Sequence, residues 1–246
     1  MSKKIAAIVL IYICTAAAWF ILGSTILYRT NIQDDKLKDA VGQLWGTAQV
    51  QKAPSVFYET KLAVENKRIE SGKTVSEIQT QTITNYIPLK SSKIDAALFL
   101  QHRKKGLLWY PTYIIKFSAL YTVSNDTPEP RDIFLEFTFP SEGAVYDDFR
   151  FIIGGKKLEN IETSKGTIKQ TIKLAPGQKE TVEIAYQSQG LDQWWYEFGE
   201  NVSQVRDFLL TMNTDFKEID FPQNSISPTQ RIPTKDGWEL KWQYSD

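Results

Sequence analysis

Cysteine and histidine are each nearly absent from this chain. Each occurs once among 246 residues, as Cys14 and His102. One cysteine excludes an intrachain disulfide and, with it, a small scaffold held together by disulfides. Zinc sites built from cysteine and histidine need more ligands than these two residues supply. We therefore expect no metal and no cofactor.

The chain also lacks a net charge of either sign. Its 29 basic and 29 acidic residues cancel. Three of the basic residues, Lys3, Lys4 and Arg29, flank an apolar segment and lie before residue 30, so residues 30–246 are slightly acidic. Nucleic-acid-binding domains are usually basic, so nucleic acid is not an expected partner. Aromatic residues make up 13% of the chain, which argues against a disordered tail and favours a β-rich domain.

An uncharged apolar segment extends from Ile5 to Leu27. As a helix it spans about 35 Å, enough to cross a hydrocarbon core of about 30 Å. Lys3 and Lys4 precede it, and the positive-inside rule keeps that end in the cytoplasm. We expect residues 1–29 to be a single-pass anchor in the inner (plasma) membrane. The lipid bilayer is then a partner, and the C-terminal domain is periplasmic or extracellular.

Two other fates of this segment compete with the anchor. The run Ala16–Ala18 offers a small-residue site for signal-peptide cleavage, but residues 19–22 continue the apolar segment past that site. Cys14 suggests a lipoprotein, but residues 11–13 lack the small side chains that such processing needs. A buried, inert thiol in a membrane helix is the preferred interpretation.

A polar stretch follows the apolar segment. Leu37, Val41, Leu44 and Ala48 recur at helical spacing, which predicts a short amphipathic stalk helix within residues 30–53, ended by Pro54. Its simplest role is to pack on the domain or on the membrane surface. Binding a partner helix is the alternative.

Residues 54–246 show the period-two alternation that is typical of strands. Long strands are expected at 93–101 and 107–123, around the charged turn 102–106. Gly154-Gly155 predicts a hairpin, and residues 175–178 predict a second one. Further alternation lies at 133–139, 182–186, 208–212 and 238–244. The predicted fold is mainly β: an antiparallel immunoglobulin-like β-sandwich preceded by the membrane helix and the stalk helix.

No motif in the chain reaches a chemical mechanism. The run 70–74 ends like a phosphate-binding loop, but Lys67 stands where that loop needs glycine. His102 lies in a basic turn, which makes a catalytic triad improbable. The acidic groups 147–148 and 215–220 lack calcium-loop spacing, and solvated turns are the preferred account. A carboxylate-dependent hydrolase stays a weak alternative, and no catalytic residue is assigned.

Two aromatic clusters are the most unusual local features. Adjacent residues on a strand face opposite sides, so Trp194 and Trp195 cannot both enter one core. Exposed aromatic side chains bind partners, sugars or lipid interfaces, although packing beneath a loop is the commoner role. The candidate interaction surface consists of Trp109, Tyr110, Tyr113, Trp194, Trp195 and Tyr196.

The C-terminal stretch carries a resemblance to a known family. Residues 208–216, 219–222, 226–229 and 237–244 resemble the end of the exported domain in bacterial inner-membrane proteins of the CreD-like group. This resemblance implies an envelope protein whose molecular activity is not established, and it assigns no catalytic residues. In that family a bundle of membrane helices follows, whereas this sequence ends at Asp246. A truncated form, or a separate chain that supplies the helices, would account for this difference.

Three functions are therefore open. The leading hypothesis is a non-enzymatic envelope protein whose anchored β-domain presents surfaces to a membrane-protein partner or envelope component. A carbohydrate- or ligand-binding module that uses exposed aromatic residues is the alternative. The carboxylate-dependent hydrolase is the third.

Overall fold

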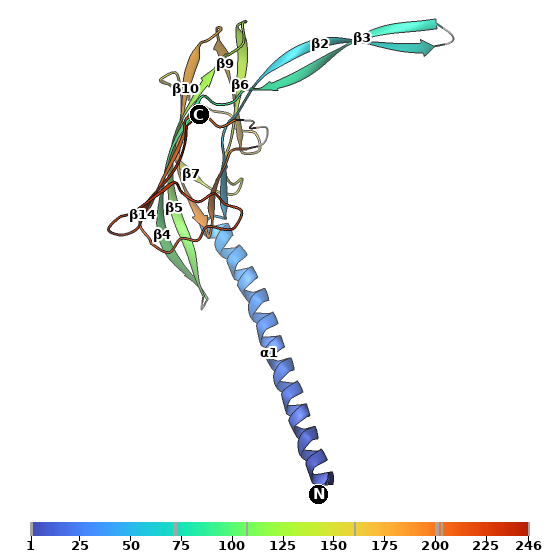
Figure 1. Ribbon diagram of the computed structural model, residues 1–246, viewed down its shortest axis with the longest axis vertical. Coiled ribbons are helices and arrows are strands. Elements are labelled where there is room, and N and C mark those ends of the chain that lie inside the picture. Colours follow the sequence, from blue (N-terminus) through green and yellow to red (C-terminus); the bar gives the residue numbers. More distant parts are fainter. Residues whose placement is uncertain are drawn as a thin grey trace.

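The computed structural model describes residues 2–70, 73–106, 108–159, 161–199, 202 and 204–245, without the side chains of residues 2 and 65–77. One helix, α1 (Ser2–Trp45), opens the chain. It is long and apolar enough to cross a membrane, and its most apolar stretch is uncovered by the rest of the protein. The expected membrane helix and stalk helix are thus a single continuous helix, which leaves the body of the protein at one end (Figure 1).

Helix α1 ends at Trp45, earlier than the predicted end at Pro54. Gly46 follows with φ of 99°, a left-handed conformation that commonly ends helices and favours glycine. A Cβ at Gly46 would lie 2.1 Å from the backbone oxygen of Gln189, so only glycine fits this crossing. The chain then enters strand β1 (Gln49–Lys52). The sequence prediction was wrong here because it let the helical pattern continue through Gly46.

The strands of the described residues form three sheets. In chain order the strands after β1 are β2 (Ser55–Glu70), β3 (Lys73–Tyr86), β4 (Ser91–Lys105), β5 (Leu108–Ser124), β6 (Arg131–Thr138), β7 (Tyr146–Ile153), β8 (Lys156–Lys157), β9 (Thr167–Leu174), β10 (Lys179–Leu191), β11 (Trp194–Glu197), β12 (Phe208–Thr214), β13 (Gln230–Pro233) and β14 (Trp238–Tyr244). The sheet orders are β13-β14-β12-β4-β5-β10-β7-β8, β3-β2-β6-β9 and β1-β11.

The two larger sheets bury one shared core, so the expectation of a mainly β fold is confirmed. Alternate residues of β4, β5 and β10 face alternate residues of β6 and β9. Fully buried side chains come from both sheets, among them Ile94, Ile115, Phe117, Tyr121, Ile133, Leu135, Phe137, Phe151, Ile168 and Ile184. Since one sheet has eight strands and the other four, the inner faces of β12, β14 and part of β4 extend past the smaller sheet.

The pairing departs from a purely antiparallel sandwich. Strands β4 and β12 run parallel, as do β1 and β11. Parallel neighbours cannot be joined by a tight hairpin, and here long stretches of chain separate the partners. Sequence alternation alone does not reveal such distant pairs.

The two predicted hairpins have different outcomes. Gly154 and Gly155 have φ of 57° and 75°, as a two-residue turn of this twist requires, and they join β7 to β8. The hairpin at 175–178 was wrong. Strand β9 pairs with β6, whereas β10 pairs with β5 and β7, so this turn carries the chain from one sheet to the other. Both strands show alternation because both face the same core.

Two further features differ from the sequence prediction. Strands β4 and β5 continue through the expected turn 102–106, and Lys105 pairs with Leu108; Leu107 lies outside the described residues. Strands β2 and β3 were not predicted. They form a long ribbon, the β2–β3 arm, which extends away from the body (Figure 1). The failed phosphate-loop motif falls at its tip, where Ser71 and Gly72 lie outside the described residues.

Candidate ligand-binding cavity

A cavity of about 1310 Å³ lies against the part of the eight-stranded sheet that extends past the smaller sheet. Its lining comes from β4, β5, β11, β12, β14 and the loop after β12. Small-molecule sites typically enclose about 300–1,000 Å³, so this space suits a large ligand.

The sheet wall of the cavity is built by register. Strand β12 pairs in parallel with β4, and Leu210 stands beside Ile94. Strand β14 pairs with β12, and Trp242 stands opposite Leu210. Paired residues point to the same face, so these strands place their apolar side chains on one surface. Those that line the cavity are Leu98, Leu100, Phe208, Leu210, Met212, Trp242 and Tyr244.

The opposite wall includes β11, which carries Trp194, Trp195 and Tyr196. Trp194 packs against the core, with its ring centroid 6.4 Å from that of Phe117. The Trp195 Nε1 group donates a hydrogen bond to Gln193 Oε1 (3.3 Å). Strand β11 pairs with β1, and β1 follows α1 after three residues. The helix is therefore connected directly to one wall of the cavity.

The loop after β12 completes the enclosure. It adds Phe216, Ile219 and Phe221 to the lining. The Trp242 Nε1 group donates to the backbone oxygen of Ile226 (2.7 Å), and the Leu100 amide donates to Asp215 Oδ1 (2.8 Å). These bonds fix both ends of the loop against the sheet.

Buried tyrosines lie in and beside the cavity: Tyr113 and Tyr196 line it, whereas Tyr121 and Tyr186 belong to the core next to it. Tyr113 donates its hydroxyl hydrogen to the backbone oxygen of Gln193 (2.6 Å), and the hydroxyl groups of Tyr121 and Tyr196 lie 3.3 Å apart. Burial raises the pKa of each of these three tyrosines above its ordinary value. Tyr186, whose pKa burial also raises, donates to Gln51 Oε1 (2.8 Å). The walls thus combine apolar surface with uncharged hydroxyl groups at neutral pH.

The cavity is elongated along the strands. One part is lined by Phe208, which lies level with Ser92 of β4, and the other by His102, ten residues further along the same strand. Ten residues of strand span about 33 Å. Next to His102 the lining includes Asp192, whose carboxylate forms an ion pair with Lys38 of α1. This ion pair raises the pKa of Lys38, and it ties α1 to that end of the cavity.

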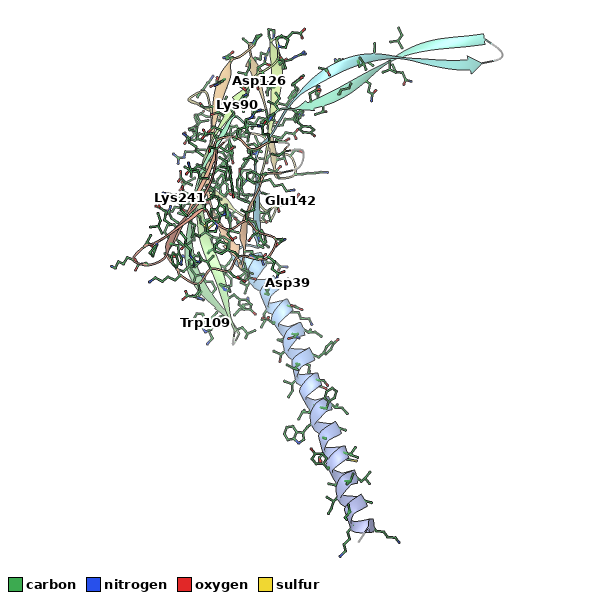
Figure 2. All side chains as sticks on the ribbon, in the orientation of Figure 1. Asp39, Lys90, Trp109, Asp126, Glu142 and Lys241 are labelled. Carbon is green, nitrogen blue, oxygen red and sulfur yellow. The ribbon has the colours of Figure 1, made fainter. Side chains whose placement is uncertain are left out.

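The structure separates the six residues of the candidate interaction surface. Tyr113, Trp194, Trp195 and Tyr196 meet at the cavity. Trp109 is 62% exposed, near the end of the β4–β5 hairpin, where Figure 2 labels it. Tyr110 is buried in a small second core with Val41 and Leu191, and its hydroxyl donates to Asp34 Oδ1 (3.1 Å).

Sequence reasoning missed the residues of β12, β14 and the intervening loop that line the cavity. They were predicted as strand residues or acidic turns, without a common site. Their signal was the density of aromatic residues between Phe208 and Tyr244, but which of them converge depends on the parallel β4–β12 pairing.

Several of the candidate catalytic groups lie in or beside the cavity. His102 is exposed and lies at one end of the cavity, and Glu218 and Asp220 are on the loop. The Asp215 carboxylate is held by the Leu100 amide. Among the described residues, no group of three or more histidine, cysteine, aspartate or glutamate side chains is arranged to hold a metal ion.

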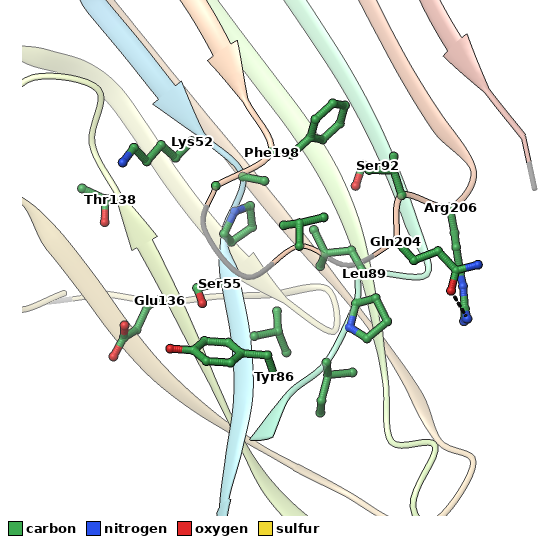
Figure 3. Close-up of a pocket in the computed structure, with 18 residues that line it drawn as sticks. Lys52, Ser55, Tyr86, Leu89, Ser92, Glu136, Thr138, Phe198, Gln204 and Arg206 are labelled. Atoms are coloured by element: carbon green, nitrogen blue, oxygen red, sulfur yellow. Dashed lines mark hydrogen bonds between the residues drawn. The ribbon is translucent and has the colours of Figure 1, made fainter. Parts of the chain in front are cut away.

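A smaller pocket of about 310 Å³ lies near the base of the β2–β3 arm (Figure 3). Lys52 and Glu136 lie on one side of it and Arg206 on the other, as Figure 3 shows. Tyr86 and Leu89 contribute apolar surface. Its mixed polar lining distinguishes it from the aromatic cavity.

Fold and cavity together define a mainly β protein with one long apolar N-terminal helix and an aromatic-lined internal space. No protein-family model matches the chain. No curated protein matches it either.

Two solved structures are similar to it. One is a Legionella pneumophila protein to which nutrient binding has been provisionally assigned. It matches this chain with a TM-score of 0.47 and 8% sequence identity, and the match covers 81% of this chain and 67% of that chain. The other is an M1 zinc metallopeptidase from Deinococcus radiodurans, with a TM-score of 0.30, 11% identity and coverage of 63% of this chain and 39% of that chain. Both TM-scores lie below 0.5, so neither likeness carries an argument about this chain.

Proposed function

We propose that this chain is a membrane-anchored, non-catalytic binding protein whose aromatic cavity takes an elongated apolar ligand of the acyl-chain class. The observation that carries the proposal is the cavity of about 1310 Å³, lined largely by aromatic and aliphatic side chains. Burial of apolar ligand surface is the dominant favourable term in such a site, at about 0.8 kcal/mol for each buried CH₂ group.

The shape of the cavity favours an extended chain over a compact sugar. Its length of about 33 Å exceeds the roughly 15 Å that the acyl chains of one leaflet span. Carbohydrate sites present many hydrogen-bonding groups, whereas here the hydroxyl groups of Tyr113 and Tyr196, which line the cavity, are already engaged within the protein. The polar side chains of His102 and Asp192 lie at one end, where a polar headgroup would fit.

Membrane anchoring through Ile5 to Leu27 is part of the same proposal, with the N-terminus in the cytoplasm and the β-domain exported. Support comes from the exposure and apolar character of this segment. The continuous helix then holds the domain near the bilayer, where acyl chains are abundant.

The test is binding of a fluorescent acyl-chain probe to the full-length chain in a short-chain detergent. Met212 lines the cavity, and the larger side chain in Met212→Trp narrows it; Thr211→Trp is the matched control, since adjacent strand residues face opposite sides. We expect Met212→Trp to weaken binding at least tenfold and Thr211→Trp to leave it within twofold. Equal affinity for both variants would rule out this cavity as the site.

Protein–protein interaction is the second candidate function, and the β2–β3 arm favours it. Beyond Tyr58, β2 pairs only with β3, so the arm is an isolated two-stranded ribbon. Such ribbons are marginally stable in water, and this one exposes Leu62 (52%) and Ile78 (72%). A membrane-protein partner, the relation to the CreD-like group and the immunoglobulin-like character of the sandwich remain proposals of the same kind.

A further inference from the structure

The end of the β4–β5 hairpin extends past the strands beside it and packs against α1. Strand β12 pairs with β4 only from Ser92 to Leu98, and β10 pairs with β5 only as far as Thr112. The described strand residues among 102–111 take part in strand pairing within the hairpin, and the Pro111 oxygen also accepts a hydrogen bond from the Asp192 amide (3.0 Å); residues 102–111 are called here the hairpin tip. Figure 1 shows the tip extending along α1, toward the N-terminal part of that helix.

The hairpin tip combines cations with exposed apolar side chains. Arg103, Lys104 and Lys105 follow one another, and Trp109 and Leu108 are 62% and 37% exposed. The Lys104 ammonium lies 5.8 Å from the centre of the Trp109 ring. Tryptophan beside lysine and arginine is the composition of a membrane–water interface, where the ring sits at headgroup level.

The cations of the tip contact aromatic rings. Arg103 and Lys105 lie over the ring of Trp45 on α1, at 5.9 and 6.0 Å. Within the described residues, no carboxylate forms an ion pair with Arg103, Lys104 or Lys105. The adjacent helix segment 29–39 holds three basic and three acidic residues, so it adds no net charge to the cations of the tip.

The position of the tip along α1 places it near the bilayer. A Cβ added to Gly106 would lie 3.7 Å from Leu37 Cδ1, so the tip reaches the level of Leu37. Leu37 is ten residues beyond Leu27, about 15 Å along a helix. The lipid headgroup layer takes up about 5–7 Å of this rise of about 15 Å. The distance that remains between the headgroups and the level of Leu37 is about one Debye length at physiological salt.

We propose that the hairpin tip binds the anionic phospholipid headgroups of the membrane that α1 crosses: Lys104 and Lys105 supply the charge, and a tilt of α1 toward the tip closes the remaining distance and brings Trp109 to the interface. This contact rests on the proposed anchoring of α1 but not on the ligand. It fixes the tilt of the domain relative to the membrane, because the hairpin tip is then a second point of attachment in addition to α1. It also turns the His102 end of the cavity toward the bilayer, because His102 and Pro111 both line that end.

The test places an environment-sensitive fluorophore on the tip of the full-length chain in vesicles. In a Cys14→Ser background, Leu108→Cys is labelled, and Ile78→Cys on the β2–β3 arm serves as the control because it is exposed and distant from α1. Vesicles contain phosphatidylcholine alone or with one quarter phosphatidylglycerol, with a spin-labelled lipid as the quencher.

We expect quenching and a blue shift at position 108 in anionic vesicles and neither at position 78. Lys104→Gln with Lys105→Gln lowers the contact equilibrium constant about 30-fold, since each cation contributes about 1 kcal/mol near an anionic surface. Salt at 0.5 M has the same effect. Emission at position 108 that is identical in both vesicle types and unaffected by the two substitutions overturns the contact. Vesicle flotation reports anchoring separately, and a chain that does not float overturns both.

Discussion

Replacing Gly46 by alanine tests how tightly α1 is joined to the domain. Gly46 has φ of 99°, and an alanine there pays about 1–2 kcal/mol for the left-handed conformation. Its Cβ would also lie 2.1 Å from the Gln189 oxygen, which must move. That oxygen accepts a bond from Gln49 Nε2 (2.8 Å), whose loss costs about 1–3 kcal/mol at a buried site. We expect Gly46→Ala to lower stability by about 3–4 kcal/mol.

Gly155→Ala is the matched control for this substitution. Gly155 has φ of 75°, but no atom lies within 4 Å of the Cβ it would gain, so only the conformational cost of about 1–2 kcal/mol applies. For a domain of this size, about 1 kcal/mol lowers Tm by roughly 2–4 °C. Near-UV circular dichroism of the full-length chain in detergent follows both transitions. Equal shifts in Tm would refute the close approach of α1 to Gln189.

Three further outcomes are expected. Val41→Ala should lower the free energy of unfolding by about 2 kcal/mol because the Val41 side chain is fully buried. Leu44→Ala should change it by under about 0.5 kcal/mol because the Leu44 side chain is 60% exposed. Thermal unfolding distinguishes the two variants. Burial raises the pKa of Tyr146 from 10.0 to about 12, so the free energy of unfolding should be unchanged below about pH 10 and fall as the pH rises toward 12. The fall is about 1.4 kcal/mol per pH unit for each tyrosine that stays protonated in the folded state. A free energy of unfolding, measured by urea titration, that stays constant up to about pH 11.5 would contradict this. Replacing residues 61–82 by Asn-Gly should leave Tm within about 2 °C, because that part of the β2–β3 arm pairs only with itself; a large loss would show that it supports the core.

The sequence predicted the features that depend on local pattern. The apolar length from Ile5 to Leu27 indicated a helix, and the Gly154-Gly155 pair indicated the β7–β8 turn, because both depend on a few adjacent residues. Alternation also located most strands of the core. It failed on the β2–β3 arm, where β3 is rich in Thr and Gln and the apolar side chains of Leu62 and Ile78 are exposed.

The candidate site could be predicted only in part. Trp194, Trp195 and Tyr196 adjoin in sequence, so their shared location followed from their positions. Tyr110 and Trp109 also adjoin, yet Tyr110 packs on α1 while Trp109 is exposed at the hairpin tip. Alternation of side chains explains this split, but the position of α1 beside β5 is a tertiary contact that no local pattern specifies.

The cavity is a consequence of the unequal width of the two main sheets. In the four-stranded sheet, β3 and most of β2 form the arm, so β6, β9 and the start of β2 face the eight-stranded sheet and leave part of its inner surface without a facing sheet. That surface carries Leu210, Leu240 and Trp242, which would be costly to leave in water. Strand β11 and the loop after β12 cover it instead of further strands. Irregular segments do not interdigitate with a pleated surface as a second sheet does, and the space that remains is the cavity. The core and the cavity share a wall: Leu98, Tyr113, Phe208, Leu210 and Trp242 belong to the core cluster and also line the cavity. Loop residues Phe216, Ile219 and Phe221 pack against that same core, so a change in the cavity wall also changes core packing.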